Sequence, residues 1–124
     1  MKESLIVKHI EKQFNSVNRF YVNIHGSYLS KNGTPDFITM DCDSNFVGLE
    51  VKNKDSFPTV NQWRKCIEIL LSNGRYIVGK EDFDLSNMDN KTLPIVRIGN
   101  TIGESEFSVS RLSLPSSFEV KLNE

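Results

Sequence analysis

Two acidic residues and one lysine are spaced in a way that suits hydrolytic chemistry. Asp36 lies in one strand-like run, and Glu50 and Lys52 lie two positions apart in the next. Side chains two positions apart point to the same face of a strand, so Glu50 and Lys52 share a face. A turn at residues 43–44 would bring Asp36 alongside Glu50 across a β-hairpin. The pattern therefore predicts two carboxylates and an ammonium group that converge on one point.

A pair of carboxylates is a hard-oxygen site that suits Mg²⁺ or Mn²⁺. Such an ion polarises a phosphodiester oxygen and lowers the pKa of a bound water. Lys52 beside that water would orient it and stabilise the negative charge that develops at phosphorus. The alternative is a solvent-facing charged pair with a cross-strand neighbour, which contributes only tenths of a kcal/mol to stability.

The elements that must position these residues alternate between helices and strands. Apolar spacing and β-branched runs predict a helix over 3–14, a strand over 20–25, hairpin strands over 35–40 and 46–52, a helix over 59–72 and a strand over 75–79. Further strands are expected over 95–98, 107–112 and 118–122, with a polar, acidic stretch over 82–90. This order is typical of an α/β or α+β domain built on a mixed sheet.

The helix over 59–72 carries the clearest local signals. Thr59 and Gln62 form a Thr-x-x-Gln pattern, which predicts a capping box at its start. Trp63, the only tryptophan, is expected to pack in the core on the apolar face of this helix.

Length and composition are those of one globular domain. The chain has 124 residues, of which 38% are hydrophobic and 25% charged. It shows no apolar run long enough to cross a membrane and no signal-peptide pattern at its start. Cys42 and Cys66 lack metal-ligand spacing, so reduced thiols in a cytoplasmic protein are expected.

The net charge of −1 argues, for the chain as a whole, against a nucleic-acid partner. The charges are unevenly distributed, however. Residues 1–80 hold eleven basic and eight acidic side chains, whereas residues 81–124 hold four and eight. The first region is mildly basic and the second acidic, so the net charge of the whole chain combines two regions of opposite sign.

Three parts of the chain together resemble the signature of the PD-(D/E)xK nuclease superfamily, and in particular its VRR-NUC branch. These parts are Gly33-Thr34-Pro35-Asp36-Phe37, then Glu50-Val51-Lys52, then Gln62 near the start of the following helix. The resemblance implies a single nuclease domain over 1–124, with a restriction-endonuclease-like core over 3–80 and a β-leaning C-terminal extension over 81–124.

The resemblance also implies roles for individual residues. Asp36, Glu50 and the carbonyl of Val51 would hold Mg²⁺ or Mn²⁺, and Lys52 would position the attacking water. Glu3 would bind metal through water or assist a second ion, although a residue in a first helical turn also interacts with the helix dipole. Gln62 is a further candidate catalytic residue, with the capping box as its competing role.

Contacts to nucleic acid are expected from polar and basic side chains around this site. The candidates are His25, Ser27, Lys31, Lys54, Arg64 and Lys65. Plain surface charge is the alternative for each basic side chain, and a structural role is the alternative for His25.

The implied activity is a metal-dependent endonuclease that cleaves DNA, with branched or Holliday-junction-like DNA as the expected substrate. Cutting two strands of a junction requires two active sites, so a homodimer is expected, and no membrane partner is. Two alternatives stay open. One is a catalytically silent binding module with a nuclease fold, and the other is the nuclease subunit of a larger restriction or repair assembly.

Overall fold

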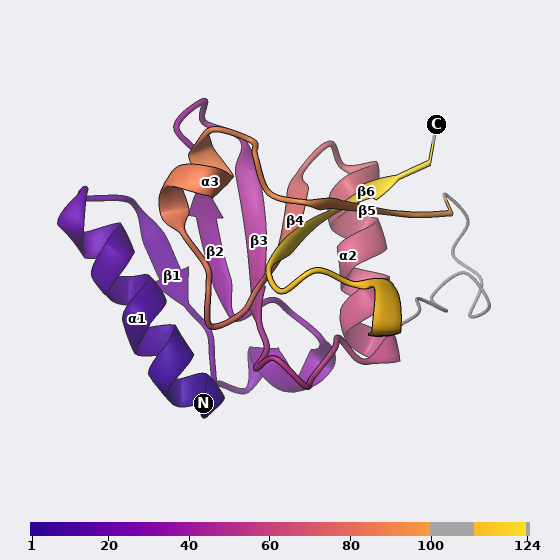
Figure 1. Ribbon diagram of the computed structural model, residues 1–124, viewed down its shortest axis with the longest axis horizontal. Helices are drawn as coiled ribbons and strands as arrows, with labels where there is room; N and C mark the ends of the chain where they lie inside the picture. Colours follow the sequence, from indigo (N-terminus) through magenta and orange to yellow (C-terminus); the bar gives the residue numbers. More distant parts are fainter. Residues whose placement is uncertain (100–110, 124) are drawn as a thin grey trace.

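The computed structural model describes residues 1–99 and 111–123 and contains one six-stranded mixed sheet with helices on both faces (Figure 1). The helices are α1 (Glu3–Ser16), α2 (Val60–Leu71) and α3 (Leu85–Asp89), with 3₁₀ turns η1 (Leu29–Asn32) and η3 (Arg111–Ser113). The strands are β1 (Tyr21–Asn23), β2 (Phe37–Met40), β3 (Phe46–Val51), β4 (Arg75–Gly79), β5 (Ile95–Ile98) and β6 (Phe118–Leu122). The α/β or α+β class predicted from the sequence is confirmed at this level.

The strands are ordered β1-β2-β3-β4-β6-β5 across the sheet. The β1–β2, β2–β3 and β4–β6 pairs are antiparallel, whereas β3–β4 and β5–β6 are parallel. The parallel β3 and β4 are joined through α2, the crossover that such a pair requires. Their carboxyl ends therefore meet at one end of the sheet, which is also where β2 begins.

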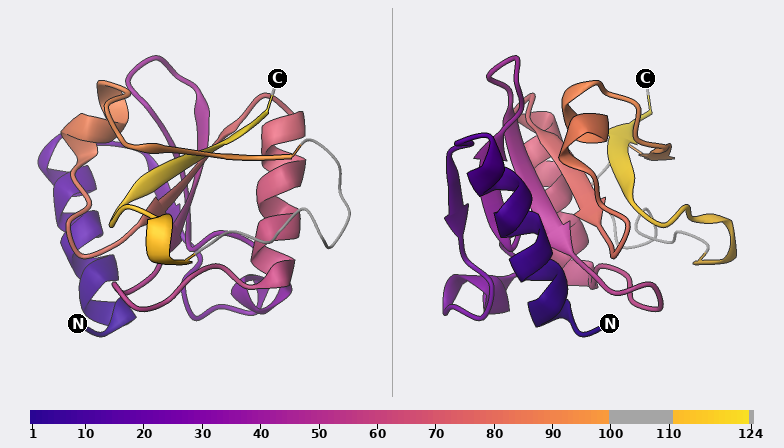
Figure 2. Two further views of the ribbon diagram at one scale, coloured as in Figure 1. Left: turned by 45° about the vertical axis from the view of Figure 1, so that its right-hand side comes forward. Right: turned by 60° about the vertical axis from the view of Figure 1, so that its left-hand side comes forward.

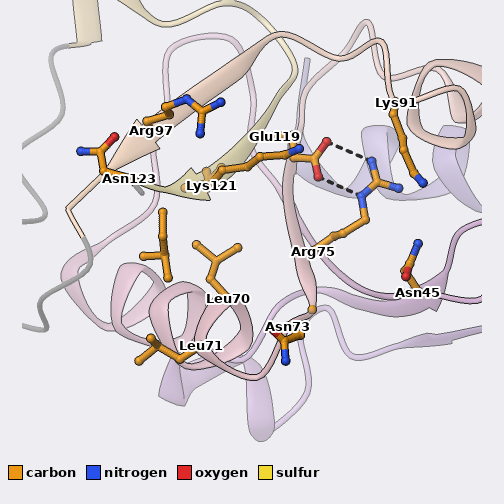
Figure 3. Close-up of a pocket in the computed structure, with 13 residues that line it drawn as sticks. Asn45, Leu70, Leu71, Asn73, Arg75, Lys91, Arg97, Glu119, Lys121 and Asn123 are labelled. Carbon is orange, nitrogen blue, oxygen red and sulfur yellow. Dashed lines mark hydrogen bonds and ion pairs between the residues drawn. The ribbon is translucent and has the colours of Figure 1, made fainter.

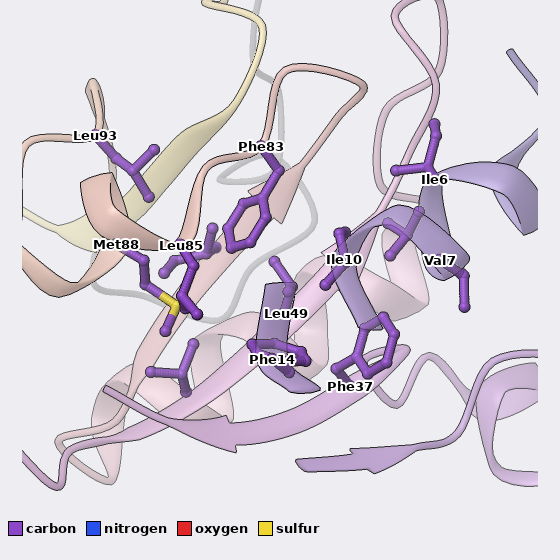
Figure 4. Close-up of a cluster of buried hydrophobic side chains, with 13 residues drawn as sticks. Ile6, Val7, Ile10, Phe14, Phe37, Leu49, Phe83, Leu85, Met88 and Leu93 are labelled. Carbon is purple, nitrogen blue, oxygen red and sulfur yellow. The ribbon is translucent and has the colours of Figure 1, made fainter. Parts of the chain in front are cut away.

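Successive side chains of β3 point to opposite faces of the sheet and pack in two different hydrophobic cores. Val47, Leu49 and Val51 pack with α1 in one buried cluster, which Figure 4 shows. Gly48 and Glu50 therefore point to the other face, which α2 covers (Figure 2). This division puts Glu50 on the α2 face of the sheet.

Helix α1 forms because its apolar residues recur at helical spacing. Ile6, Ile10 and Phe14 are completely buried, and Phe14 packs edge-on against Phe37 with ring centroids 5.5 Å apart. These residues of α1 cover the face of the sheet opposite to Glu50.

Helix α2 starts with the predicted capping box. The Thr59 hydroxyl accepts from the Gln62 N–H at 3.3 Å, and the Gln62 side chain accepts from the Thr59 N–H at 2.8 Å. Trp63 is 4% exposed in the core beneath α2, as the apolar spacing predicts. No helix within residues 1–99 and 111–123 has the length and apolar character needed to span a bilayer.

One expectation beyond residue 80 needs correction. The strand expected over 107–112 is wrong at its end, since Arg111–Ser113 forms a 3₁₀ turn, and residues 107–110 lie outside the described residues. Pro115 follows closely and lacks the N–H that a strand ladder needs. The polar stretch 82–90 contains the short helix α3, which the Asp84 side chain caps by accepting from the Ser86 N–H.

Candidate active site

The β2–β3 hairpin brings Asp36 and Glu50 together. The register pairs Phe37 with Leu49, so the preceding residue Asp36 lies opposite Glu50. The Asp36 N–H donates to Glu50 Oε2 at 3.3 Å, and both residues are buried. The juxtaposition predicted from spacing is therefore present in the structure.

The Asp36 carboxylate is held by one group on each oxygen. Oδ2 accepts from the Val51 N–H at 2.8 Å, and Oδ1 lies 2.9 Å from His25 Nδ1. A carboxylate only accepts hydrogen bonds, so Nδ1 of His25 carries the proton in this pair. The candidate contact residue His25 therefore touches the site through Asp36.

Glu50 has the most perturbed environment of the site. Its side chain is 1% exposed, and burial raises its pKa to about 9, with the nearby negative charge of Asp36 adding to the rise. The charge of Lys52 acts in the opposite direction and lowers this pKa. Without a bound cation, Glu50 is consequently neutral at pH 7, and a cation placed between the two carboxyl groups would favour its ionised form.

Lys52 lies at the end of β3 on the same face as Glu50. Its backbone N–H donates to the Gly79 carbonyl at 3.0 Å, which extends the β3–β4 ladder by one residue. Its side chain is half-buried at the open end of the sheet. The backbone of Lys52 is thus fixed by the ladder, and its side chain is not fully buried.

Gln62 is committed to the capping box rather than to the carboxylates. Its Oε1 is occupied by the Thr59 N–H at 2.8 Å, which leaves its Nε2 for any other contact. The loop before β2 nevertheless presses on this helix start, because a Cβ on Gly33 would lie 2.5 Å from the Asn61 carbonyl oxygen. Gly33 also has φ of +85°, so the position favours glycine for two separate reasons.

Glu3 is not joined to the carboxylate pair. Helix α1 packs on the sheet face opposite to Glu50, and its amino end is tied down by the Met1 ammonium, 3.2 Å from Glu81 Oε1. Across the described part of the chain, no three His, Cys, Asp or Glu side chains gather as a metal-binding group. The structure therefore brings together two of the predicted acidic ligands, Asp36 and Glu50.

The predicted nucleic-acid contacts are dispersed around this end of the molecule. Lys31 lies on η1, and Lys65 is exposed but pairs with Glu68 at 3.1 Å. Arg64 Nη1 donates to Asn61 Oδ1 at 3.4 Å. The Ser27 hydroxyl is buried in the loop that follows His25 and has no hydrogen-bond partner among residues 1–99 and 111–123.

Lys80 is a residue near the site that the spacing argument missed. It follows β4 just as Lys52 follows β3, and it is 2% exposed. Its Nζ lies 3.9 Å from the centre of the Phe57 ring and donates to the Lys54 carbonyl at 3.3 Å. Burial lowers its pKa. The signal available in the sequence is a lysine at the end of two strand-like runs, Lys52 and Lys80. The parallel pairing of β3 and β4 sets these two residues side by side.

Tyr76 was also missed, since its position reads only as an apolar strand residue. It is completely buried on the α2 face, and its hydroxyl has no hydrogen-bond partner in the part of the chain that the structure describes. Burial, followed by the charges of Glu50, Cys66 and Asp36, raises its pKa well above the ordinary value. A neutral phenol therefore lies in the core beneath α2, near Glu50 and Asp36.

The chain was compared with family models, curated proteins and solved structures, and none of them matches. The function of this site is accordingly inferred from its own chemistry.

Proposed function

We propose that the protein is a divalent-metal-dependent nuclease that hydrolyses phosphodiester bonds in DNA at the Asp36–Glu50–Lys52 site. The observation that carries the proposal is the buried carboxylate pair, in which the Asp36 N–H lies 3.3 Å from Glu50 Oε2 and the pKa of Glu50 is raised. Burying two acids beside a lysine at the end of a sheet lowers the stability of the fold, so a functional role is the better explanation of this arrangement. The resemblance to the PD-(D/E)xK superfamily supports the same reading.

The donor set fits Mg²⁺ or Mn²⁺. Mg²⁺ in proteins commonly uses one or two carboxylates and keeps several waters, and Asp36 and Glu50 offer that number. The Val51 carbonyl is the third oxygen that we assign. When bound, such an ion polarises the phosphodiester and lowers the pKa of a coordinated water.

The chain's own residues supply positioning and charge. Lys52 orients the attacking water and stabilises the negative charge on the phosphoryl oxygens. The Val51 N–H and His25 Nδ1 hold the Asp36 carboxylate from two sides, at 2.8 and 2.9 Å. This leaves His25 Nε2 to accept from solvent in the neutral ring, or to donate to a substrate phosphate when both ring nitrogens are protonated.

The test is cleavage of branched, nicked, duplex and single-stranded DNA, and of RNA, with Mg²⁺, Mn²⁺ or excess EDTA. We expect Asp36→Asn, Glu50→Gln and Lys52→Met each to lower the cleavage rate by about 10²-fold or more. Asp43→Asn and Lys12→Met remove exposed charges elsewhere and serve as matched controls. Cleavage that persists in the three site variants would refute the assignment.

Metal binding provides a readout that does not depend on turnover. Titration calorimetry with Mn²⁺ should show binding to the wild type that is lost in Asp36→Asn and retained in Asp43→Asn. DNA binding without cleavage under any metal would instead favour the catalytically silent module.

The preference for branched DNA and the homodimer are parts of the proposal that require their own measurement. Two cuts across a junction need two sites, which a symmetric dimer supplies. Light scattering of the free protein and of its complex with a four-way junction would distinguish a dimer from a single subunit of a larger assembly.

A further inference from the structure

Two buried hydroxyl groups lack a hydrogen-bond partner in the described part of the chain, and both belong to residues near the carboxylate pair. One is the hydroxyl of Ser27, which follows His25 by two positions, and His25 contacts Asp36 at 2.9 Å. The other is the hydroxyl of Tyr76 on β4, whose neighbour β3 carries Glu50. Buried polar groups without a partner are rare in native proteins, so each requires an explanation.

Tyr76 and Glu50 point to the same face of the sheet. The register pairs Tyr76 with Gly48 and Glu50 with Val78, so the two residues are offset by two positions on adjacent parallel strands. Tyr76 and Val78 both belong to the core beneath α2, which fixes the face that they share with Glu50. An offset of two residues is about 7 Å along a strand, which a tyrosine and a glutamate side chain can bridge between them.

The ring of Tyr76 extends toward the end of the sheet where Glu50 lies. Helix α2 starts at Val60, after the end of β3, so its first turns lie over the carboxyl ends of β3 and β4. Trp63 in this part of α2 is a neighbour of the Tyr76 ring, with 6.3 Å between the ring centroids. Helix side chains tilt toward the amino end of their helix, so Trp63 does not reach back toward the start of β4. Since Tyr76 is the second residue of β4, its ring leans along the strand to meet Trp63.

The hydroxyl is closed off from the opposite end of the sheet. Arg75, which precedes Tyr76, lines a groove at the start of β4 and binds Glu119 there, as Figure 3 shows. Tyr76 is not among the described residues that line this groove, and it is 0% exposed. Solvent in the groove therefore does not reach the hydroxyl.

Glu50 is the acceptor best suited to this donor. The charges of Glu50, Cys66 and Asp36 add to the effect of burial on the pKa of Tyr76, which is raised well above its ordinary value. A cysteine sulfur is a weak acceptor, and both carboxylate oxygens of Asp36 already have a partner. Glu50 accepts the Asp36 N–H at Oε2, and a carboxylate has room for further donors.

We infer that Tyr76 is a positioning residue of the metal site, whose O–H donates to the Glu50 carboxylate when a divalent ion is bound. The inference rests on the Asp36–Glu50 site of the proposed function and adds a residue outside the ligands. A ligating carboxylate is itself held by hydrogen bonds, and such outer partners orient it and raise the affinity for the ion. The alternative is that Tyr76 is only a ring in the core beneath α2, with no part in metal binding.

The experiment compares Mn²⁺ binding by the wild type, Tyr76→Phe and Tyr28→Phe in titration calorimetry. Tyr28→Phe is the matched control, because it removes the same hydroxyl from a residue that is 79% exposed. We expect Tyr76→Phe to bind Mn²⁺ about tenfold more weakly and the control to differ from the wild type by less than about twofold. The rise in melting temperature on adding Mn²⁺ should likewise be smaller in Tyr76→Phe, which keeps the aromatic ring.

Tyrosine absorption provides a second readout that does not require the Tyr76→Phe variant to fold. A phenol that begins to donate to a carboxylate absorbs at longer wavelength. Adding Mg²⁺ should therefore shift the tyrosine band of the wild type and of Tyr28→Phe, and leave that of Tyr76→Phe unchanged. Saturation with Mg²⁺ without this shift in the wild type would overturn the inference.

Metal affinity and cleavage together separate this inference from the proposed function. If Tyr76→Phe and the wild type bind Mn²⁺ equally and the wild type cleaves DNA, the inference fails and the proposed function stands. If Tyr76→Phe binds Mn²⁺ more weakly but the wild type does not cleave, the inference stands and the nuclease is refuted. Equal losses of affinity in Tyr76→Phe and Tyr28→Phe would overturn the inference, and a wild type that binds neither ion would refute both.

Discussion

The two ends of the central sheet differ in the partners that their buried carboxylates have. At one end, Asp41 and Glu119 share the guanidinium of Arg75, which contacts them at 2.6 and 2.8 Å. At the other end, Asp36 and Glu50 face each other without a bound guanidinium, and the oxygen of one accepts the backbone N–H of the other. The first arrangement is a network of ion pairs with opposite charges adjacent. The second places two acids together, whose charges would repel each other if both were ionised.

The pKa values follow from this difference. Burial alone would raise the pKa of Asp41, but hydrogen bonds from Asn45, Arg75 and the Asp43 N–H outweigh it and lower the pKa to about 2. At the other end, burial and Asp36 raise the pKa of Glu50 to about 9. The first arrangement pairs each buried carboxylate with a cation, and we interpret it as structural. The second has no such pairing, and under the proposed function a cation binds there in use.

The largest effect should come from removing the shared guanidinium. Arg75→Met leaves Asp41 and Glu119 buried without their partner, so we expect the free energy of unfolding to fall by about 3–5 kcal/mol. Urea denaturation at neutral pH measures this value. Lys91→Met, which removes an exposed ion pair with Asp43, should change it by less than about 0.5 kcal/mol. Similar losses in the two variants would contradict the assigned structural role.

The next effect concerns the opposite end and depends on pH. The pKa of Glu50 is about 9 in the folded protein against 4.5 for the free group, so the folded state binds one proton more between these values. Its contribution to stability is full below about pH 4.5 and is lost as the pH rises toward 9. Between about pH 6 and pH 8, the metal-free wild type should lose about 2.5 kcal/mol relative to Glu50→Gln. Parallel stability curves for the two proteins would show that Glu50 is ionised without metal.

Asp41 should show the reverse dependence on pH. Its pKa is lower in the folded protein, about 2 against 3.8, so its contribution is present above pH 3.8 and lost as the pH falls toward 2. Acid unfolding should cost the wild type about 2 kcal/mol more than Asp41→Asn over this interval. Asp43→Asn is the control, because its exposed carboxylate pairs only with Lys91. An acid dependence unchanged in Asp41→Asn would rule out this source of stability.

The smallest effect is expected at Tyr76. Its buried hydroxyl has no hydrogen-bond partner among the described residues, so Tyr76→Phe removes an unsatisfied polar group and keeps the ring. We expect a gain in the free energy of unfolding of up to about 1 kcal/mol. A loss of more than that in chemical denaturation would show that the hydroxyl is bonded, by water or by Glu50. The Tyr76 hydroxyl would then have a hydrogen-bond partner, as the buried carboxylates beside Arg75 do.

The end that carries Asp36 and Glu50 could be predicted from the sequence because its signals are local. Asp36 and Glu50 meet through one hairpin, and the Thr59–Gln62 capping box is contained in four residues. The strand period and the turn residues suffice to place such pairs. The contact between His25 and Asp36 could not be placed in this way, because it depends on the conformation of the loop at 26–34.

The structural end could not be predicted, because its contacts are distant in sequence. Arg75 meets Asp41 across 34 positions and Glu119 across 44, and no periodicity connects these three residues. The same holds for β6, which spacing identified as a strand but could not locate in the sheet. Residues 118–122, within the extension predicted over 81–124, pair with β4 in the same sheet as the strands of the core predicted over 3–80. Long-range pairing is set by packing, which a local pattern does not contain.

The position of β6 between β4 and β5 determines the order in which the sheet is completed. Within the described residues, β5 pairs only with β6, and β4 has no other partner on that side. A growing chain therefore presents the bare edge of β4 until residues 118–122 have left the ribosome. Unpaired strand edges attract strands of other molecules, so chains interrupted before β6 should aggregate during synthesis even though their hairpin is already complete.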